Sequence, residues 1–199
     1  MSKVIDFYFD FASPNAYLSN KALQDVVERT GANINYIPVL LGGIFKLTNN
    51  KPPMEAFFGI QNKNEYQSLE MQRFIERHGI NEFQMNPHFP VMTLQVMRAA
   101  VAAKEDNYLE DYIQKILIHM WEKPKKMDDP EVIHAAFLES GLDADKLMSQ
   151  MQDPAIKVKL ISNTDEAVKR GVFGIPTFFV EDEMYFGKDT LWMVEEAVS

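Results

Sequence analysis

The segment DFYFDFASPNAYLSNKAL, residues 6–23, sets the architecture of this chain, because an apolar run stops at Ser13-Pro14 and a helical pattern begins at once. The run 3–10 is rich in Ile, Phe and Tyr, which favours a strand. Apolar residues then recur at helical spacing until Gly31, a residue type that commonly ends helices. A second strand is predicted in NINYIPVLL, residues 33–41. A crossover of about twenty residues indicates a parallel β-α-β unit.

The middle of the chain has a different pattern. Residues 42–68 combine Gly, Asn, Pro and aromatic residues without a sustained period, which predicts a loop with short helical pieces. Loops of this length in a compact domain commonly carry function. From 65 to 160 helical periodicity dominates, and Asp129-Pro130 and Asp153-Pro154 start helices, because Pro is favoured in a first helical turn. The sequence therefore predicts an all-helical block.

The C-terminal part returns to mixed structure. NTDEAVKRG, residues 163–171, predicts a helix, and IPTFFVEDEMYFG, residues 175–187, predicts two short strands around an acidic turn. Residues 188–199 predict a final helix. The predicted order is β-α-β, a helical insertion, then α-β-β-α, so we expect an α/β fold in which both ends of the chain fold together around the insertion.

Composition restricts the classes of function. The 199 residues include 20 basic and 29 acidic side chains, and the net charge of -9 disfavours nucleic acid or a membrane surface as a partner. No apolar segment predicts a membrane span or a secretory signal, so we expect a soluble, cytoplasmic protein. With no Cys, the chain forms no disulfide and has no redox-active Cys-X-X-Cys motif. The four His residues are not spaced as metal ligands, so no metal is expected.

Ser13 has two interpretations. Ser is a leading N-cap residue and Pro14 suits the first helical position, so Ser13 is firstly a helix cap. A helix N-terminus at the carboxyl end of a strand also presents free N–H groups and a partial positive charge, which suits an anion such as a thiolate. Because the chain has no Cys, such a thiol has to come from a ligand.

Two later segments are open to two interpretations as well. Pro176 is either an ordinary proline at a strand start or a proline of special geometry, including cis, that leaves the backbone N–H and C=O of Ile175 free for an incoming peptide. At the start of the last helix, Lys188 and Asp189 are either capping and surface residues or a site for an amino-acid ligand. Such a ligand needs an anion for its ammonium and N–H donors for its carboxylate.

Four motifs follow one another in the order of a known family: FYFDFASPNAYLSN, LLGGIFKLTNNKPP, FPVMTLQVMRAA and RGVFGIPTFFVEDEMYFGKDTLWMVE. Together they resemble the 2-hydroxychromene-2-carboxylate isomerase and kappa-class glutathione transferase family, a branch of the DsbA-like thioredoxin superfamily. The resemblance runs from about residue 4 to 198. It implies a thioredoxin-like domain formed by residues 1–45 and 160–199, interrupted by a loop and helical insertion domain over residues 46–159.

The resemblance also implies roles for individual residues. Ser13 occupies the position of the first Cys of DsbA-like redox enzymes, and its hydroxyl is implied to donate to the sulfur of glutathione, which lowers the thiol pKa. Ile175 beside Pro176 is implied to pair with the cysteinyl backbone, and Asp189 and Thr190 with the γ-glutamyl end. The implied glutathione-binding set is Ser13, Asn50, Lys63, Ile175, Pro176, Lys188, Asp189 and Thr190, and Lys46 is the candidate for a substrate carboxylate.

The function that the resemblance implies is a glutathione-dependent isomerase of the 2-hydroxychromene-2-carboxylate isomerase type, which acts on an aromatic catabolite through a transient thiolate adduct and regenerates glutathione. One alternative is a kappa-type glutathione transferase that releases the conjugate. Another is a non-catalytic glutathione- or peptide-binding thioredoxin-like module. The expected partners are glutathione, a small aromatic or unsaturated substrate, and a second copy in a homodimer. Many family members have Asn where this chain has Met92, so a polar contact to the substrate is expected to be missing.

Overall fold

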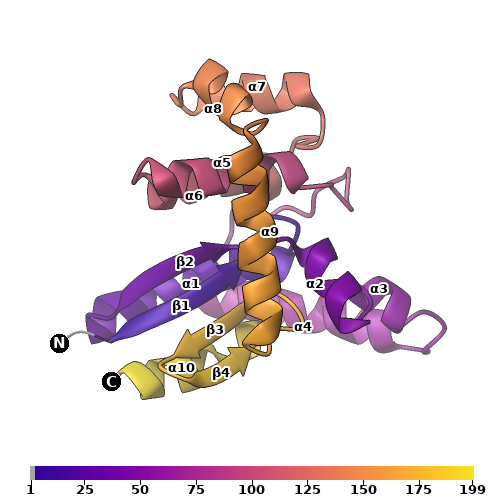
Figure 1. The fold of residues 1–199 in the computed structure, drawn as a ribbon. Helices are drawn as coiled ribbons and strands as arrows, with labels where there is room; N and C mark the ends of the chain where they lie inside the picture. The colour runs from indigo at the N-terminus through magenta and orange to yellow at the C-terminus, as the bar shows by residue number, and fades with distance from the viewer. Residues whose placement is uncertain (1–2) are drawn as a thin grey trace.

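A mixed sheet forms the centre of the molecule in the computed structural model, which describes residues 3–199 (Figure 1). Its strands are β1 (Val4–Phe9), β2 (Asn33–Pro38), β3 (Thr177–Val180) and β4 (Glu183–Phe186), in the order β2-β1-β3-β4. β1 pairs in parallel with β2, and β3 is antiparallel to both β1 and β4. The predicted β-α-β unit and the predicted C-terminal strand pair are therefore confirmed.

Helix α1 (Pro14–Thr30) connects β1 to β2 and ends where the sequence predicts, at Gly31. Gly31 has a φ of 69°, a left-handed conformation that glycine adopts without the strain a side chain would add. The other helices are α2 (Leu41–Thr48), α3 (Pro53–Ala56), α4 (Lys63–His78), α5 (Leu94–Glu105), α6 (Leu109–Trp121), α7 (Pro130–Glu139), α8 (Ala144–Gln150), α9 (Pro154–Lys169) and α10 (Leu191–Val198), the last preceded by a 3-10 turn (Lys188–Thr190).

One helix was predicted as two. Residues 163–171 are not a separate helix, because α9 runs without interruption from Pro154 to Lys169. The polar run around Thr164 resembles a helix start, but the Thr164 hydroxyl donates to the Leu160 carbonyl of the preceding turn at 2.8 Å and stays within the helix. The predicted domain boundary between residues 159 and 160 falls inside α9. The division into two domains therefore remains a prediction.

The helical insertion lies at the carboxyl end of the parallel strands. Figure 1 shows α5 to α8 stacked above the sheet, with α9 running from that layer across the front of the sheet and α1 behind it. Trp121 at the end of α6 is fully buried, and its indole N–H donates to the Phe11 carbonyl at 3.0 Å. The insertion is thus fixed to the loop that follows β1.

Aromatic rings fill the space between the sheet and the helices. The ring centroids of Phe7 and Phe178 are 4.7 Å apart, and those of Phe7 and Tyr36 are 5.6 Å apart. These rings are buried, and removing such a side chain from water stabilises the fold by roughly 1.5–3 kcal/mol. The packed rings make a rigid base for the loops at the carboxyl ends of β1 and β2.

Candidate functional site

Ser13 lies at the N-terminus of α1, directly after the β1 turn, and is only 5% exposed. Its Oγ accepts a hydrogen bond from the Ala16 N–H at 3.2 Å, so the predicted N-cap is confirmed. The hydroxyl in turn donates to the Ile175 carbonyl at 3.2 Å. Pro14 has no N–H, and among residues 3–199 the Asn15 N–H has no hydrogen-bond partner. The helix therefore keeps one free backbone donor beside the Ser13 hydroxyl.

The Ile175-Pro176 peptide bond is cis, which is the special geometry considered from the sequence. The prediction that both backbone groups of Ile175 are free is wrong for the carbonyl, because the Ser13 hydroxyl donates to it. The Ile175 N–H has no hydrogen-bond partner in the described part of the chain. The Pro176 carbonyl accepts from the Gly187 N–H at 2.9 Å, which places the start of the last helix beside this segment.

Asn50 is connected to the same region through its side chain. Its Nδ2 donates to the Phe173 carbonyl at 2.9 Å, and its Oδ1 accepts from the Lys51 N–H at 2.8 Å. Asn50 therefore positions the segment that leads to Ile175. Lys63 begins α4 and instead places its Nζ 4.9 Å from the ring centroid of Phe57. Within the described residues, Lys63 makes no hydrogen bond to Ser13, Ile175 or Asn50.

Lys188 is buried, with 3% of its side chain exposed, and its ammonium donates to Glu70 and, at 2.9 Å, to Asp189 Oδ1. It is therefore neither a surface residue nor an open ligand site, and it joins α4 to the start of α10. Asp189 is 68% exposed, and its second carboxylate oxygen has no partner among the described residues. The Thr190 hydroxyl donates to the Gly187 carbonyl at 2.9 Å.

Asp10 is a polar residue of this region that sequence reasoning missed. It is 1% exposed, and its Oδ1 accepts from the Thr93 hydroxyl at 2.6 Å and the Ala12 N–H at 2.9 Å, while Oδ2 accepts from the Leu41 N–H at 2.7 Å. Burial raises the pKa of Asp10, although the three hydrogen bonds oppose that shift. The Asp10 carbonyl accepts from the Ser13 N–H at 3.1 Å. The sequence does contain one signal of a buried carboxylate here, because Asp10 is flanked by two Phe residues.

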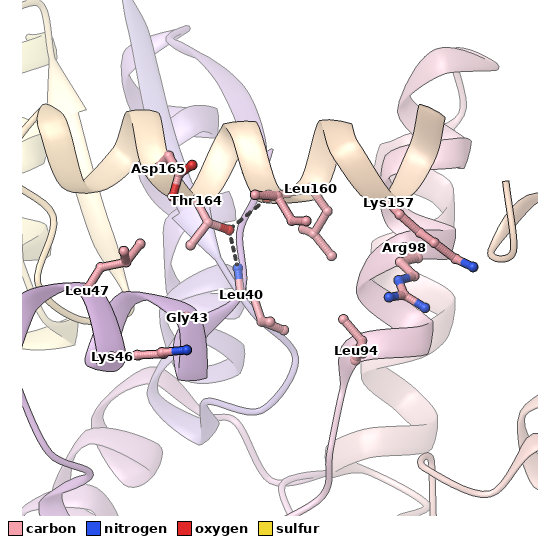
Figure 2. A pocket seen from close by; sticks show the side chains of 11 residues that line it. Leu40, Gly43, Lys46, Leu47, Leu94, Arg98, Lys157, Leu160, Thr164 and Asp165 are labelled. Atoms are coloured by element: carbon pink, nitrogen blue, oxygen red, sulfur yellow. Dashed lines mark hydrogen bonds between the residues drawn. The ribbon is translucent and has the colours of Figure 1, made fainter. Parts of the chain in front are cut away.

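Lys46 lines a cavity of about 210 Å³ between α2, α5 and α9 (Figure 2). Arg98 from α5 and Lys157 from α9 lie at its other end, and neither was identified from the sequence. The remaining lining residues are Leu40, Gly43, Leu47, Leu94, Leu160, Ile161, Thr164 and Asp165. Ser13, Ile175 and Asn50 are not among the lining residues.

The described residues contain neither a metal-binding cluster nor a membrane-spanning helix. Over residues 3–199, no three His, Asp or Glu side chains lie together in a way that would hold a metal ion. The same part of the chain contains no helix that is both long and apolar enough to cross a membrane.

The sheet order, the helical insertion and the capped α1 beside a cis-proline define a thioredoxin fold of the DsbA type. The profile of the DSBA-like thioredoxin domain matches residues 4–199, and the chain belongs to this family. It is 27% identical to a 2-hydroxychromene-2-carboxylate isomerase of Sphingobium xenophagum, over 98% of this chain and 97% of the relative. It is 24% identical to human glutathione S-transferase kappa 1, over 96% and 88%.

The fold is also similar to that of a solved 2-hydroxychromene-2-carboxylate isomerase, with a TM-score of 0.84 and 25% identity over 98% of this chain and 93% of the other. A probable DsbA oxidoreductase from Streptomyces coelicolor shares the fold, with a TM-score of 0.75 and 15% identity over 98% and 88%. The predicted fold class and family are therefore confirmed. An enzymatic role is supported, because the relatives are named as isomerases and transferases.

Proposed function

We propose that this chain is a glutathione-dependent isomerase of the 2-hydroxychromene-2-carboxylate isomerase type, in which Ser13 keeps the bound thiol ionised. The observation that carries the proposal is the place of the Ser13 hydroxyl, which lies at a helix N-terminus between the Ala16 N–H and the Ile175 carbonyl, in a chain without Cys. The 27% identity to named isomerases along almost the whole chain supports the same activity.

The residues around Ser13 fit a peptide thiol. The Ile175 N–H lacks a partner among the described residues, so it is available to the carbonyl of a cysteinyl residue. If the Ser13 hydroxyl turns from the Ile175 carbonyl to the sulfur, that carbonyl becomes free to accept from the cysteinyl N–H. The Ser13 hydroxyl and the Ile175 carbonyl then each exchange one hydrogen bond for another, and the Ile175 N–H gains one. This is the backbone pairing that an extended peptide makes with the edge of a sheet.

Ser13 and the start of α1 act on the proton of the thiol. When bound, glutathione supplies the nucleophilic sulfur that the reaction needs and is not consumed. A hydrogen bond from Ser13 and the free Asn15 N–H both favour the ionised sulfur, and the partial positive charge of the helix end adds to them. Each unit by which they lower the thiol pKa corresponds to about 1.4 kcal/mol of differential stabilisation.

The remaining predicted residues take supporting roles in this proposal. The exposed carboxylate of Asp189 and the neighbouring Thr190 bind the γ-glutamyl end, and Lys188 holds Asp189 in place. Asn50 and Lys63 border the glutathione, and Lys46 faces a substrate carboxylate. A cytoplasmic location, a homodimer and an aromatic or unsaturated substrate belong to the same proposal.

The cap and the catalytic roles of Ser13 are separated by two variants. Ser13→Ala removes the cap and is expected to cost about 1 kcal/mol of stability, whereas Ser13→Gly is tolerated at an N-cap and costs only a few tenths. Both lack the hydroxyl, so both are expected to lower the thiolate ultraviolet absorbance of bound glutathione at pH 7. Unchanged absorbance in the folded Ser13→Gly protein would show that Ser13 only caps the helix.

The competing activities are separated by following the free thiol. With 2-hydroxychromene-2-carboxylate and glutathione, an isomerase converts the substrate while total free thiol stays constant. A kappa-type transferase instead consumes thiol, and chlorodinitrobenzene serves as the parallel test electrophile. Calorimetric uptake of glutathione without turnover of either compound would identify a non-catalytic binding module and overturn the proposal.

A further inference from the structure

We propose that Asp10 is a positioning residue, which together with Thr93 holds the Ser13 hydroxyl in the orientation that a bound thiol needs. The proposal rests on the proposed function and adds the groups through which the helical insertion acts on Ser13. Asp10 and Ser13 are the first and last residues of the turn between β1 and α1, and the Ser13 N–H donates to the Asp10 carbonyl at 3.1 Å. Whatever fixes Asp10 therefore also fixes the backbone that carries the Ser13 hydroxyl.

The side chain of Asp10 closes this turn from within. Its Oδ1 accepts from the N–H of Ala12, two residues further on, at 2.9 Å. Asp side chains stabilise tight turns through this kind of local contact. Between these two residues, the Phe11 carbonyl accepts from the Trp121 indole N–H of the insertion. The turn is thus held both by its own first residue and by a residue of the insertion.

Two further donors reach Asp10 from outside the turn. The Thr93 hydroxyl, directly before α5, donates to Oδ1 at 2.6 Å, and the N–H of Leu41, the first residue of α2, donates to Oδ2 at 2.7 Å. Both Asp10 and Thr93 are buried, so water does not compete for these bonds. Two helices that are distant in sequence are thereby anchored to the turn that carries Ser13, and a change at Thr93 is passed on to that turn.

The chemistry of Asp10 suits this role better than that of an amide or an apolar side chain. Three donors converge on its two oxygens, and a carboxylate accepts at both, whereas Asn presents an NH₂ donor on one side. No Lys, Arg or His side chain pairs with Asp10 within residues 3–199. Burying an unpaired carboxylate is costly, so the three contacts that it makes have to offset that cost.

The Ser13 hydroxyl has little freedom to move without losing its contacts. It lies 3.2 Å from the Ala16 nitrogen and 3.2 Å from the Ile175 oxygen, at the long end of the range for hydrogen bonds. A displacement of roughly a few tenths of an ångström is enough to weaken such contacts. Loosening the turn is therefore expected to weaken the bond from Ser13 to the sulfur. The contacts proposed for the rest of glutathione, at the Ile175 N–H and at Asp189, lie outside the turn.

The test changes Thr93, because this residue acts on Ser13 only through Asp10. Thr93→Val removes the hydroxyl and keeps the shape of the side chain, and the pKa of the bound glutathione thiol is measured from its thiolate ultraviolet absorbance against pH. We expect this pKa to rise by at least about 0.5 units, which is about a threefold fall in the ratio of thiolate to thiol. Thr93→Ser restores the hydroxyl and is expected to return the pKa to the wild-type value.

Two controls separate positioning from a general loss of structure. S-methylglutathione has no ionisable thiol, so its calorimetric affinity for Thr93→Val is expected to stay within about twofold of the wild-type value. Thr30→Val is the matched variant at the other end of α1, where the Thr30 hydroxyl donates to the Val26 carbonyl at 2.7 Å and accepts from the Ala32 N–H at 3.3 Å. It is expected to lower the urea midpoint of unfolding without changing the thiol pKa.

The outcomes distinguish this inference from the proposed function. If the wild type does not ionise bound glutathione, both fail. If the wild type ionises it and Thr93→Val leaves the thiol pKa unchanged, or Thr30→Val raises it equally, only the positioning role of Asp10 and Thr93 is refuted. An equal loss of affinity for S-methylglutathione also refutes it, because the variant then disturbs the whole binding surface. Thr93→Ala is the replacement if circular dichroism shows that Thr93→Val does not fold.

Discussion

Two polar regions flank the start of α2 and differ in how their charges are satisfied. On one side, the buried Asp10 carboxylate accepts three hydrogen bonds from two separate parts of the chain and its own turn. On the other side, Lys46, Arg98 and Lys157 line a cavity and have no partner among the described residues. Both regions carry charge at the junction of the sheet and the insertion. Only the charge of Asp10 has hydrogen-bond partners within the described part of the protein.

A charged group whose partners lie within the protein stabilises the fold, whereas a charged group without such partners is available to a ligand. Buried polar groups are almost always hydrogen-bonded when their role is to hold the fold. Asp10 follows this rule and connects the turn after β1 to the starts of α2 and α5. Of the cavity cations, only Arg98 departs from it, through its buried Nε, since Lys46 is exposed and Lys157 is partly exposed. Such departures concentrate at sites that bind other molecules. The comparison makes three predictions.

The largest effect is expected from Asp10→Ala. The substitution leaves the Ala12 N–H, the Thr93 hydroxyl and the Leu41 N–H without their acceptor, which outweighs the relief of burying a charge. We expect the free energy of unfolding in urea to fall by about 3 kcal/mol. Asp182→Ala, in the exposed β3–β4 turn, is the control and is expected to change it by less than about 0.5 kcal/mol. A loss as small as the control's would refute the structural role of Asp10.

An effect of intermediate size is expected from a comparison of two arginines, Arg170 with its partners and Arg98 without them. Arg170 donates to Asp6 at 2.6 Å and to the Glu181 carbonyl at 2.7 Å, and its guanidinium carbon lies 3.9 Å from the ring centroid of Phe179. Arg170→Gln is expected to lower the unfolding free energy by about 2 kcal/mol. Arg98→Gln breaks no interaction and removes a buried donor that lacks a partner, so it is expected to leave the unfolding free energy unchanged or to raise it by up to about 1 kcal/mol. If urea titrations give equal losses, Arg98 is structural and the contrast between the regions disappears.

The smallest effect concerns pH. Because burial raises the pKa of Asp10, the folded state holds this proton more tightly than the unfolded state does. The contribution of Asp10 to stability is therefore complete below its unfolded pKa and declines as pH rises through the folded value. Relative to Asp10→Asn, the wild type is expected to lose about 1.4 kcal/mol for each unit between the two pKa values. Urea titrations of both proteins from mildly acidic to neutral pH measure this, and a constant difference would contradict it.

Much of the fold was predictable because its signals are local. Ser13-Pro14 starts α1 and Gly31 ends it through residues that lie next to one another in sequence. The family resemblance implied that Ser13 and Ile175 both contact glutathione, but it did not predict the hydrogen bond between them. The Asp10 contacts were not predictable, because Leu41 and Thr93 are 31 and 83 residues away. Nothing in the local sequence marks which distant donor a buried carboxylate will meet.

Two of the three lysines that the resemblance implied as ligand contacts, Lys188 and Lys46, show the same limit. Lys188 resembles a surface residue in sequence, and its burial depends on Glu70, which is 118 residues away. Lys46 was singled out as a carboxylate contact, but its neighbours Arg98 and Lys157 were not, because each follows an ordinary helical pattern. A cavity exists only once three helices have packed together, and no single helix carries its signature.

The buried ammonium of Lys188 also determines the balance of charge at the start of α10. Glu70 and Asp189 together carry two negative charges and Lys188 one positive charge, so this group has one uncompensated negative charge. A peptide that arrives with a free amino terminus neutralises it, whereas an acylated peptide leaves it unbalanced. If glutathione binds as proposed, this charge favours ligands with a free amino group over ligands with a blocked one.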